Sequence, residues 1–143
     1  MFAAYTSPVT SHTTPHIAII GAGPAGLMAA EMLSAAGVQV HVYDAMPSVR
    51  RKFLLAGLGG LNLTHAEPFD TFITRYAERS DACAVWLKPF DAAAICAWVK
   101  GLGLDTFVGS SQRIFPTDMK AAPLLRAWIQ RLRHPVQGVP VTF

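Results

Sequence analysis

The stretch that decides the fold is HIAIIGAGPAGLMAAEMLSAAGVQVHVYD, from His16 to Asp44. It opens with a short β-branched run and passes through three glycines and a proline into an alanine-rich segment. An alternating apolar run then ends at a single acid. These patterns predict a buried strand over 17–20, a helix over 25–36 and a second strand over 38–43. A strand, helix and strand in so short a stretch form a βαβ unit, whose two strands are parallel neighbours.

The three glycines between the first strand and the helix fit the pattern GxGxxG. Gly21 permits a tight turn, Gly23 lets the backbone approach a pyrophosphate, and Gly26 lets the helix pack close to the strands. Unpaired N–H groups at the helix start, with the positive end of the helix dipole, attract an anion. The predicted pyrophosphate-binding loop consists of Gly21, Ala22, Gly23, Pro24, Ala25 and Gly26.

A single acid ends the second predicted strand. Asp44 lies 18 residues beyond Gly26, about where the carboxylate that binds a ribose is expected. A carboxylate suits the ribose 2′-OH and repels a 2′-phosphate, which disfavours NADP, although the nearby Arg50 and Arg51 can offset a phosphate. The alternative is a glycine-rich turn followed by an ordinary surface aspartate. The spacing and charge of Asp44 favour the first interpretation, and we predict that Asp44 binds the ribose of a dinucleotide.

Composition favours a folded globule without a nucleic-acid or membrane partner. Of the 143 residues, 52% are hydrophobic and 15% are charged, which suits one domain with a sizeable core. The net charge of +3 comes without a long basic run, which argues against nucleic acid. The uncharged run 17–30 is too short to span a bilayer. Residues 1–15 lack the features of a signal peptide and are predicted to form a disordered tail. The two cysteines, which show no motif spacing, fit the expected cytoplasmic location.

The sequence predicts no metal site. Cys83 and Cys96 show no CxxC or zinc spacing and are interpreted as small core residues. His41 and His65 lack a nearby Asp or His at a spacing typical of metal ligands. Trp86, Trp98 and Trp128 lie on apolar helical faces and are also predicted to belong to the core.

Beyond the first unit, short helices and a hairpin are predicted. Asp91 is expected to cap a helix that carries Ile95 and Val99 on its apolar face. Apolar runs at 104–108 and 113–115, on either side of a Gly-Ser-Ser-Gln turn, predict the hairpin.

A further helix and a strand are predicted near the end of the chain. The helix spans 121–133, and the strand spans 139–143. The inward face of the helix is predicted to consist of Leu124, Leu125, Trp128 and Leu132. The arginines predicted to be solvated are Arg126, Arg131 and Arg133.

A second glycine-rich segment follows the βαβ unit. Residues 50–65 read RRKFLLAGLGGLNLTH, where a simple NAD dehydrogenase commonly has another helix. Dense glycines suggest a second approach of backbone to a ligand, which suits the long FAD molecule. The alternatives are a flexible surface loop and an NAD-binding domain without flavin.

Three motifs give the sequence a resemblance to a known family. They are GAGPAGLMAA at 21–30, RKFLLAGLGGLNLTH at 51–65 and RIFPTDMKAAPLLRAW at 113–128. On these motifs the chain resembles the BaiN-like (RdsA-type) NAD(P)/FAD-dependent flavoprotein oxidoreductases. The resemblance implies an α/β fold, namely a Rossmann-like βαβ dinucleotide-binding fold that forms part of a two-dinucleotide-binding-domain flavoprotein.

The resemblance also implies a domain organisation. Members of the family are usually longer, with a two-part FAD domain and an inserted cap domain. The chain is therefore expected to be an N-terminal fragment or a truncated product, with 16–143 as the N-terminal part of an FAD-binding domain. Residues 81–134 would form the helical and hairpin region at the start of the cap, leading into the strand at 139–143.

Residue roles follow from the same resemblance. The loop at 21–26 would hold the FAD pyrophosphate and Asp44 the adenosine ribose, with NAD(P)H as a possible electron donor. Arg113 would face the substrate, the alternative being a surface arginine at the end of the hairpin. The residues implied to lie along the cofactor toward the flavin are Lys52, Gly59, Gly60 and Asn62.

One departure from the family bears on activity. Many members carry Gly-Arg-Cys-Asn where this chain has Gly59, Gly60, Leu61 and Asn62, so an activity that needs that cysteine is not expected. No catalytic residue is predicted, because a flavin itself carries the chemistry. The expected function is an FAD-binding oxidoreductase. The alternatives are an NAD-binding Rossmann domain without flavin and a non-catalytic remnant.

Overall fold

The predicted strand, helix and strand are present. The structure is a computed structural model that describes residues 15–45, 51–56 and 59–143, so most of the predicted tail lies outside the described residues. Strand β1 (His16–Ile20), helix α1 (Pro24–Ala35) and strand β2 (Gln39–Tyr43) follow one another in order. The two strands pair in parallel over their whole length, which is the arrangement that a crossover helix produces.

The β2 alternation places two valines in the core. Val40 and Val42 are 0% and 4% exposed, whereas Tyr43 is 56% exposed. The α1 helix ends near Gly37, whose φ of +80° is a conformation that favours glycine at a helix C-terminus. The short connection from α1 to β2 therefore follows from local sequence.

Helix α6 (Ala121–Arg133) has the predicted bounds and the predicted inward face. Its inward residues are all at most 6% exposed, namely Leu124, Leu125, Trp128 and Leu132. The strand predicted over 139–143 is reduced to one parallel bridge, between Thr142 and His41 of β2. Pro140 precedes the bridge and has no N–H to donate, which limits pairing there.

Glu31 of α1 joins two other helices. Its Oε2 accepts hydrogen bonds from Trp98 Nε1 at 3.2 Å and from Trp128 Nε1 at 2.6 Å. Its Oε1 forms an ion pair with Nη2 of Arg131 at 2.6 Å. The pair lacks the alignment of a hydrogen bond, so Nη2 and Nε of Arg131 make no hydrogen bond with the described residues. Arg131 also lies 5.6 Å from the centre of the Trp98 ring. The prediction that Arg131 is solvated is therefore wrong, because its partner lies on a distant segment.

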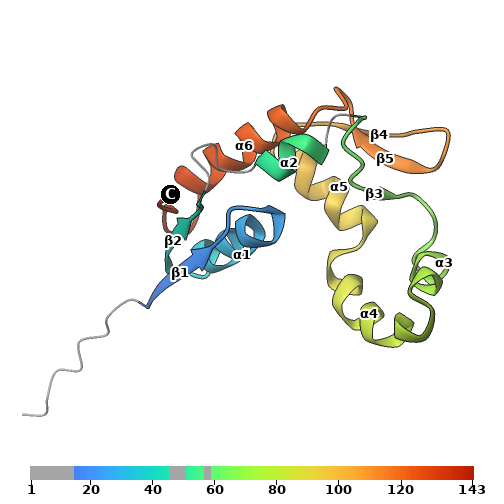
Figure 1. Cartoon of the computed structure of the whole chain (residues 1–143), viewed down its shortest axis with the longest axis horizontal. Helices are drawn as coiled ribbons and strands as arrows, with labels where there is room; N and C mark the ends of the chain where they lie inside the picture. The colour runs from blue at the N-terminus through green and yellow to red at the C-terminus, as the bar shows by residue number, and fades with distance from the viewer. Residues whose placement is uncertain (1–14, 46–50, 57–58) are drawn as a thin grey trace, which may run out of the picture.

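A second, antiparallel sheet lies apart from β1 and β2. It has the order β3 (Thr64–His65), β5 (Arg113–Pro116), β4 (Thr106–Val108), and its β4–β5 pair is the predicted hairpin. The β3 strand and the short helix α2 (Arg51–Ala56) were not predicted. Figure 1 shows α6 running from the β1–β2 end of the molecule toward this second sheet.

Several short helices connect β3 to β4. They are α3 (Phe69–Ile73), η1 (Thr74–Arg79), α4 (Ser80–Leu87), η2 (Lys88–Phe90) and α5 (Ala92–Gly101). Asp91 caps α5 as predicted, with its Oδ1 accepting from Ala94 N at 2.9 Å. Trp86 is 73% exposed, so its prediction as a core residue is wrong. Cys83 and Cys96 are both only partly buried.

The same segment has the length and the apolar composition of a membrane-spanning helix. Phe69–Gly101 is long and apolar enough to cross a membrane by length and composition alone, and little of it is buried. The backbone does not form one continuous helix, because Ala77 has φ 46° and ψ −122°. Its longest regular piece is α5, with 10 residues, about half of the roughly 20 residues that a spanning helix needs.

Candidate nucleotide-binding site

The glycine loop closes tightly onto the end of β2. Gly21 has φ +104°, which favours glycine, and its N–H donates to the carbonyl of Tyr43 at 2.7 Å. A Cβ on Gly26 would collide with the carbonyl oxygen of Gly21 and lie 3.3 Å from Cγ2 of Ile19. Gly21 therefore makes the turn, and Gly26 allows α1 to pack against β1.

Gly23 faces open space at the start of α1 and, unlike Gly21, does so with a negative φ. It is the N-cap of α1, with φ −74° and ψ 177°, and a Cβ added there would meet no atom within 4 Å. Pro24 occupies the first turn, which has neither an acidic residue nor a side-chain cap. The helix start thus offers backbone N–H groups and the positive end of a 12-residue helix to an anion.

Asp44 reaches the glycine loop. Its Oδ2 accepts a hydrogen bond from Ala22 N at 2.9 Å, although the two residues are 22 positions apart. Ala22 is fully buried, and its amide is engaged by this carboxylate. The amides suited to a pyrophosphate are therefore those of Gly23, Ala25 and Gly26, because Pro24 has no N–H to donate. A pyrophosphate fits these residues, because the space that a Cβ on Gly23 would fill is open.

The other predicted cofactor residues lie elsewhere in the fold. Lys52 belongs to α2, and its side chain lies outside the described part of the structure. A Cβ on Gly59 would meet nothing within 4 Å, whereas one on Gly60 would lie 2.7 Å from Cε of Met119. Asn62 lines a cleft beside the second sheet. In the described ranges, no hydrogen bond joins 59–62 to the glycine loop.

The cleft beside the second sheet was not predicted as a whole. It has a volume of about 730 Å³ and lies between β3, β5 and the helices α3 to α5. Arg113, which the family resemblance placed near substrate, lines it. The side chain of Glu67 accepts two hydrogen bonds from Arg75, at 2.5 and 2.9 Å, inside this cleft. The residues of this pair lie eight positions apart across a helix start, so no short motif marks them.

The hydrogen bonds from Arg75 hold the pKa of Glu67 below its ordinary value of 4.5. Desolvation raises this pKa, whereas the positive charges of Arg75 and of protonated His65 lower it further. Nδ1 of His65 lies 3.4 Å from the Glu67 carboxylate. Because its pKa is lowered on folding, the Glu67 carboxylate stabilises the fold above pH 4.5 and loses this effect as the pH falls below that value.

The variant Glu67→Gln tests this pH dependence. We expect it to be less stable than the unmodified protein at pH 7, with the difference shrinking as the pH falls below about 4.5. Urea unfolding at a series of pH values measures the difference. A difference that stays constant from neutral to acidic pH would contradict the proposed role of the Glu67–Arg75 pair.

Comparisons with known proteins agree with the geometry of the first unit. A family model described as HI0933-like protein Rossmann domain matches residues 15–141. A stretch of 33 residues is 58% identical to a protein named putative oxidoreductase UacF, from Escherichia coli strain K12. That stretch covers 23% of this chain and 5% of the length of UacF. The family match confirms the Rossmann-like α/β fold predicted from the βαβ unit and the resemblance drawn from the motifs. The chain belongs to the HI0933-like family, and residues 15–141 make up its Rossmann domain.

Proposed function

We propose that this chain binds FAD and acts as the dinucleotide-binding part of an oxidoreductase. The observation that carries the proposal is the open start of α1, where Gly23 faces free space and Asp44 lies beside the same loop. A helix start of this kind suits a pyrophosphate, and a neighbouring carboxylate suits a ribose hydroxyl. The name of UacF, a putative oxidoreductase, agrees with this class of function.

FAD is favoured over NAD by the segment that follows the βαβ unit. The resemblance implies that Lys52, Gly59 and Asn62 lie along the cofactor, and the open space at Gly59 is compatible with a ligand there. A bound flavin would accept and donate a hydride or electrons, with NAD(P)H as the proposed donor. The chain would hold and orient the cofactor. An NAD-binding domain without flavin is the second candidate, because Asp44 suits the ribose of NAD equally well.

Retention of nucleotide tests the two candidates directly. Purified protein is dialysed against FAD or NADH, and bound nucleotide is measured by its visible absorption or fluorescence. FAD retained in preference to NADH is the expected result. NADH retained without FAD would favour the second candidate, and failure to retain either would overturn the proposed function.

Replacing Asp44 should weaken FAD binding through the adenosine ribose. We expect Asp44→Ala to raise the Kd for FAD by roughly 5- to 140-fold, which corresponds to the loss of about 1–3 kcal/mol expected for a hydrogen bond to a charged group. Titration of flavin fluorescence measures the Kd. Asp44→Asn keeps an oxygen for Ala22 N–H and should weaken binding less.

FMN supplies a control for the loop itself, because it has no adenosine. Its affinity should be the same for Asp44→Ala and the unmodified protein. An equal loss of affinity for FMN and FAD would indicate that Asp44 acts only by supporting the loop.

A further inference from the structure

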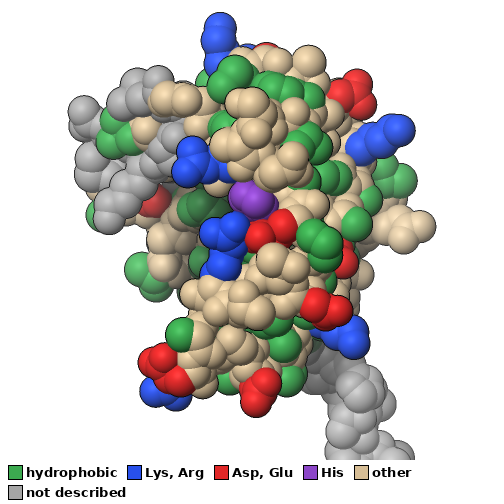
Figure 2. Space-filling view, turned by 90° about the vertical axis from the view of Figure 1, so that its right-hand side faces the viewer, with side chains coloured by type: hydrophobic (Ala, Val, Ile, Leu, Met, Phe, Trp, Pro, Cys, Tyr) green, Lys and Arg blue, Asp and Glu red, His purple; other side chains and the backbone are tan. Residues whose placement is uncertain are grey.

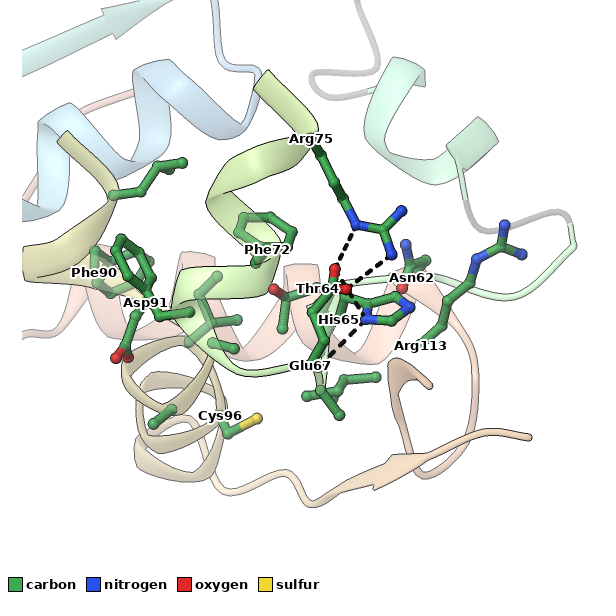
Figure 3. Close-up of a pocket in the computed structure, with 18 residues that line it drawn as sticks. Asn62, Thr64, His65, Glu67, Phe72, Arg75, Phe90, Asp91, Cys96 and Arg113 are labelled. Atoms are coloured by element: carbon green, nitrogen blue, oxygen red, sulfur yellow. Dashed lines mark hydrogen bonds and ion pairs between the residues drawn. The ribbon is translucent and has the colours of Figure 1, made fainter. Parts of the chain in front are cut away.

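The cleft beside the second sheet is divided into a polar end and an apolar end. Figure 3 shows Asn62, His65 and Arg113 together at one end, while Phe72 and Phe90 lie at the other. Its volume of about 730 Å³ falls within the range of small-molecule sites. On the face shown in Figure 2, basic and acidic side chains gather around a histidine at the centre, beside hydrophobic side chains. This division suits a ligand that has an apolar body and one polar group.

The charges at the cleft leave one cation available to a ligand. Arg75 is neutralised by Glu67 through two hydrogen bonds. The carboxylate of Asp91 caps α5 by accepting from Ala94 N. Arg113 is exposed and makes no ion pair with any residue that the structure describes. The polar end therefore carries an uncompensated positive charge, which favours an anionic ligand.

Two further donors lie beside Arg113. His65 is directly opposite it in the pairing of β3 with β5. Nδ1 of His65 accepts from Glu67 N at 3.3 Å, so Nε2 carries a hydrogen whether the ring is neutral or protonated. The amide of Asn62 also lines the cleft. A carboxylate accepts hydrogen bonds from all three of these groups and donates none, so it matches this end of the cleft.

The opposite end suits an aromatic ring. Phe69, Phe72 and Phe90 line the cleft together with Ile95 and Cys96. Aromatic side chains favour another ring in edge-to-face or offset contact. The geometry points to a binding site for an aromatic carboxylate, with the carboxylate on Arg113 and the ring among the phenylalanines. The further assignment of this anion as the substrate rests on the proposed oxidoreductase function, whereas its binding does not.

Cys96 provides a direct readout of occupancy, because it lines the cleft. The chain has two cysteines, and Cys83→Ser leaves Cys96 as the only thiol. We expect 2-naphthoate to slow the alkylation of Cys96 by iodoacetamide in a saturable way. The neutral isostere 2-naphthamide should protect at least tenfold less well, because it cannot pair with the guanidinium.

Arg113→Gln, made in the same Cys83→Ser protein, should raise the naphthoate concentration for half-protection at least tenfold. Arg126→Gln is the matched control, since Arg126 is an exposed arginine of α6 outside the cleft lining, and it should leave protection unchanged. Circular dichroism verifies that each variant is folded. Absence of protection in the parent, or equal protection by naphthoate and naphthamide, or unchanged protection in Arg113→Gln, would overturn the proposal.

Measuring bound FAD in the same samples separates this proposal from the proposed function. Naphthoate protection in a protein that retains no FAD would support the cleft while contradicting the cofactor. Bound FAD without naphthoate protection would contradict the cleft alone. Protection of Cys96 by FAD that naphthoate does not reproduce would assign the cleft to the cofactor and overturn the aromatic carboxylate.

Discussion

Gly23→Val should fold normally and lose all measurable FAD binding. A Cβ at Gly23 meets nothing within 4 Å beyond its chain neighbours, and the extended backbone there, with φ −74° and ψ 177°, is open to any residue. Loss of glycine at this N-cap costs about 1 kcal/mol of stability. The valine methyl groups would instead fill the space proposed for the pyrophosphate. Urea unfolding and FAD titration measure the two effects separately.

Gly26→Val is the matched comparison for Gly23→Val, and we expect it to lower stability instead. Its Cβ would strike the backbone carbonyl of Gly21, which has no side-chain freedom with which to move away. Overpacking costs about 1–3 kcal/mol, and occasionally more. Because the clash here is with backbone, we expect a loss at the upper end of that range. A Gly23→Val protein that still binds FAD would show that the loop does not hold the pyrophosphate. A Gly26→Val protein of normal stability would show that α1 does not pack against β1 as described.

Glu31→Ala should cause a second large loss, of about 2–4 kcal/mol in the free energy of unfolding. The substitution removes the acceptor of two indole N–H groups and leaves Arg131 without its carboxylate. Removal of one partner of a fully buried ion pair costs about 3–5 kcal/mol. The side chains of Glu31 and Arg131 are 20% and 27% exposed, so we expect a smaller effect than full burial would give.

Two variants give this experiment its controls. Glu31→Gln retains one oxygen that both indoles can donate to, as they do to Oε2, and loses only the charge opposite Arg131, so it should lose less stability than Glu31→Ala. Glu78→Ala removes an exposed acid from η1 and should change stability by about 0.5 kcal/mol or less. Urea unfolding measures all three variants. A loss below about 1 kcal/mol for Glu31→Ala would mean that Glu31 does not tie α1 to α5 and α6.

The sequence predicts those parts of the fold that depend on residues close to one another in the chain. The βαβ unit depends on strand periodicity, on the glycines of one turn and on a helix of ordinary length. The Asp91 cap and the buried face of α6 likewise follow from residues within a few positions of one another. These elements match the predictions closely, because neighbouring residues alone determine them.

The parts that sequence misses depend on distant partners. The β3 strand has only two residues and exists through its pairing with β5. Arg131 becomes part of a packed network because Glu31, a hundred positions earlier, meets it across the helices. Gly60 has a φ of +102° and little free space beside Met119. The backbone conformation and the packing therefore favour glycine here, whether or not a ligand binds. None of these contacts leaves a short-range pattern in the sequence.

The same distinction applies to the two candidate sites. The glycine loop and Asp44 belong to one βαβ unit, and the hydrogen bond from Ala22 N to Asp44 places them side by side. The cleft combines β3, β5 and three helices, and its Glu67–Arg75 pair becomes visible only after folding. Arg113 was singled out through family resemblance, and its position opposite His65 required the strand pairing.

The hydrogen bond from Ala22 N to Asp44 has a consequence for the kinetics of the proposed nucleotide binding. The carboxylate is already oriented by the folded backbone before any nucleotide arrives. Such preorganisation lowers the entropy lost on association, so docking of the adenosine half needs no prior rearrangement of this carboxylate. We therefore expect single-exponential association whose observed rate rises linearly with nucleotide concentration, without the plateau that a slow opening step imposes.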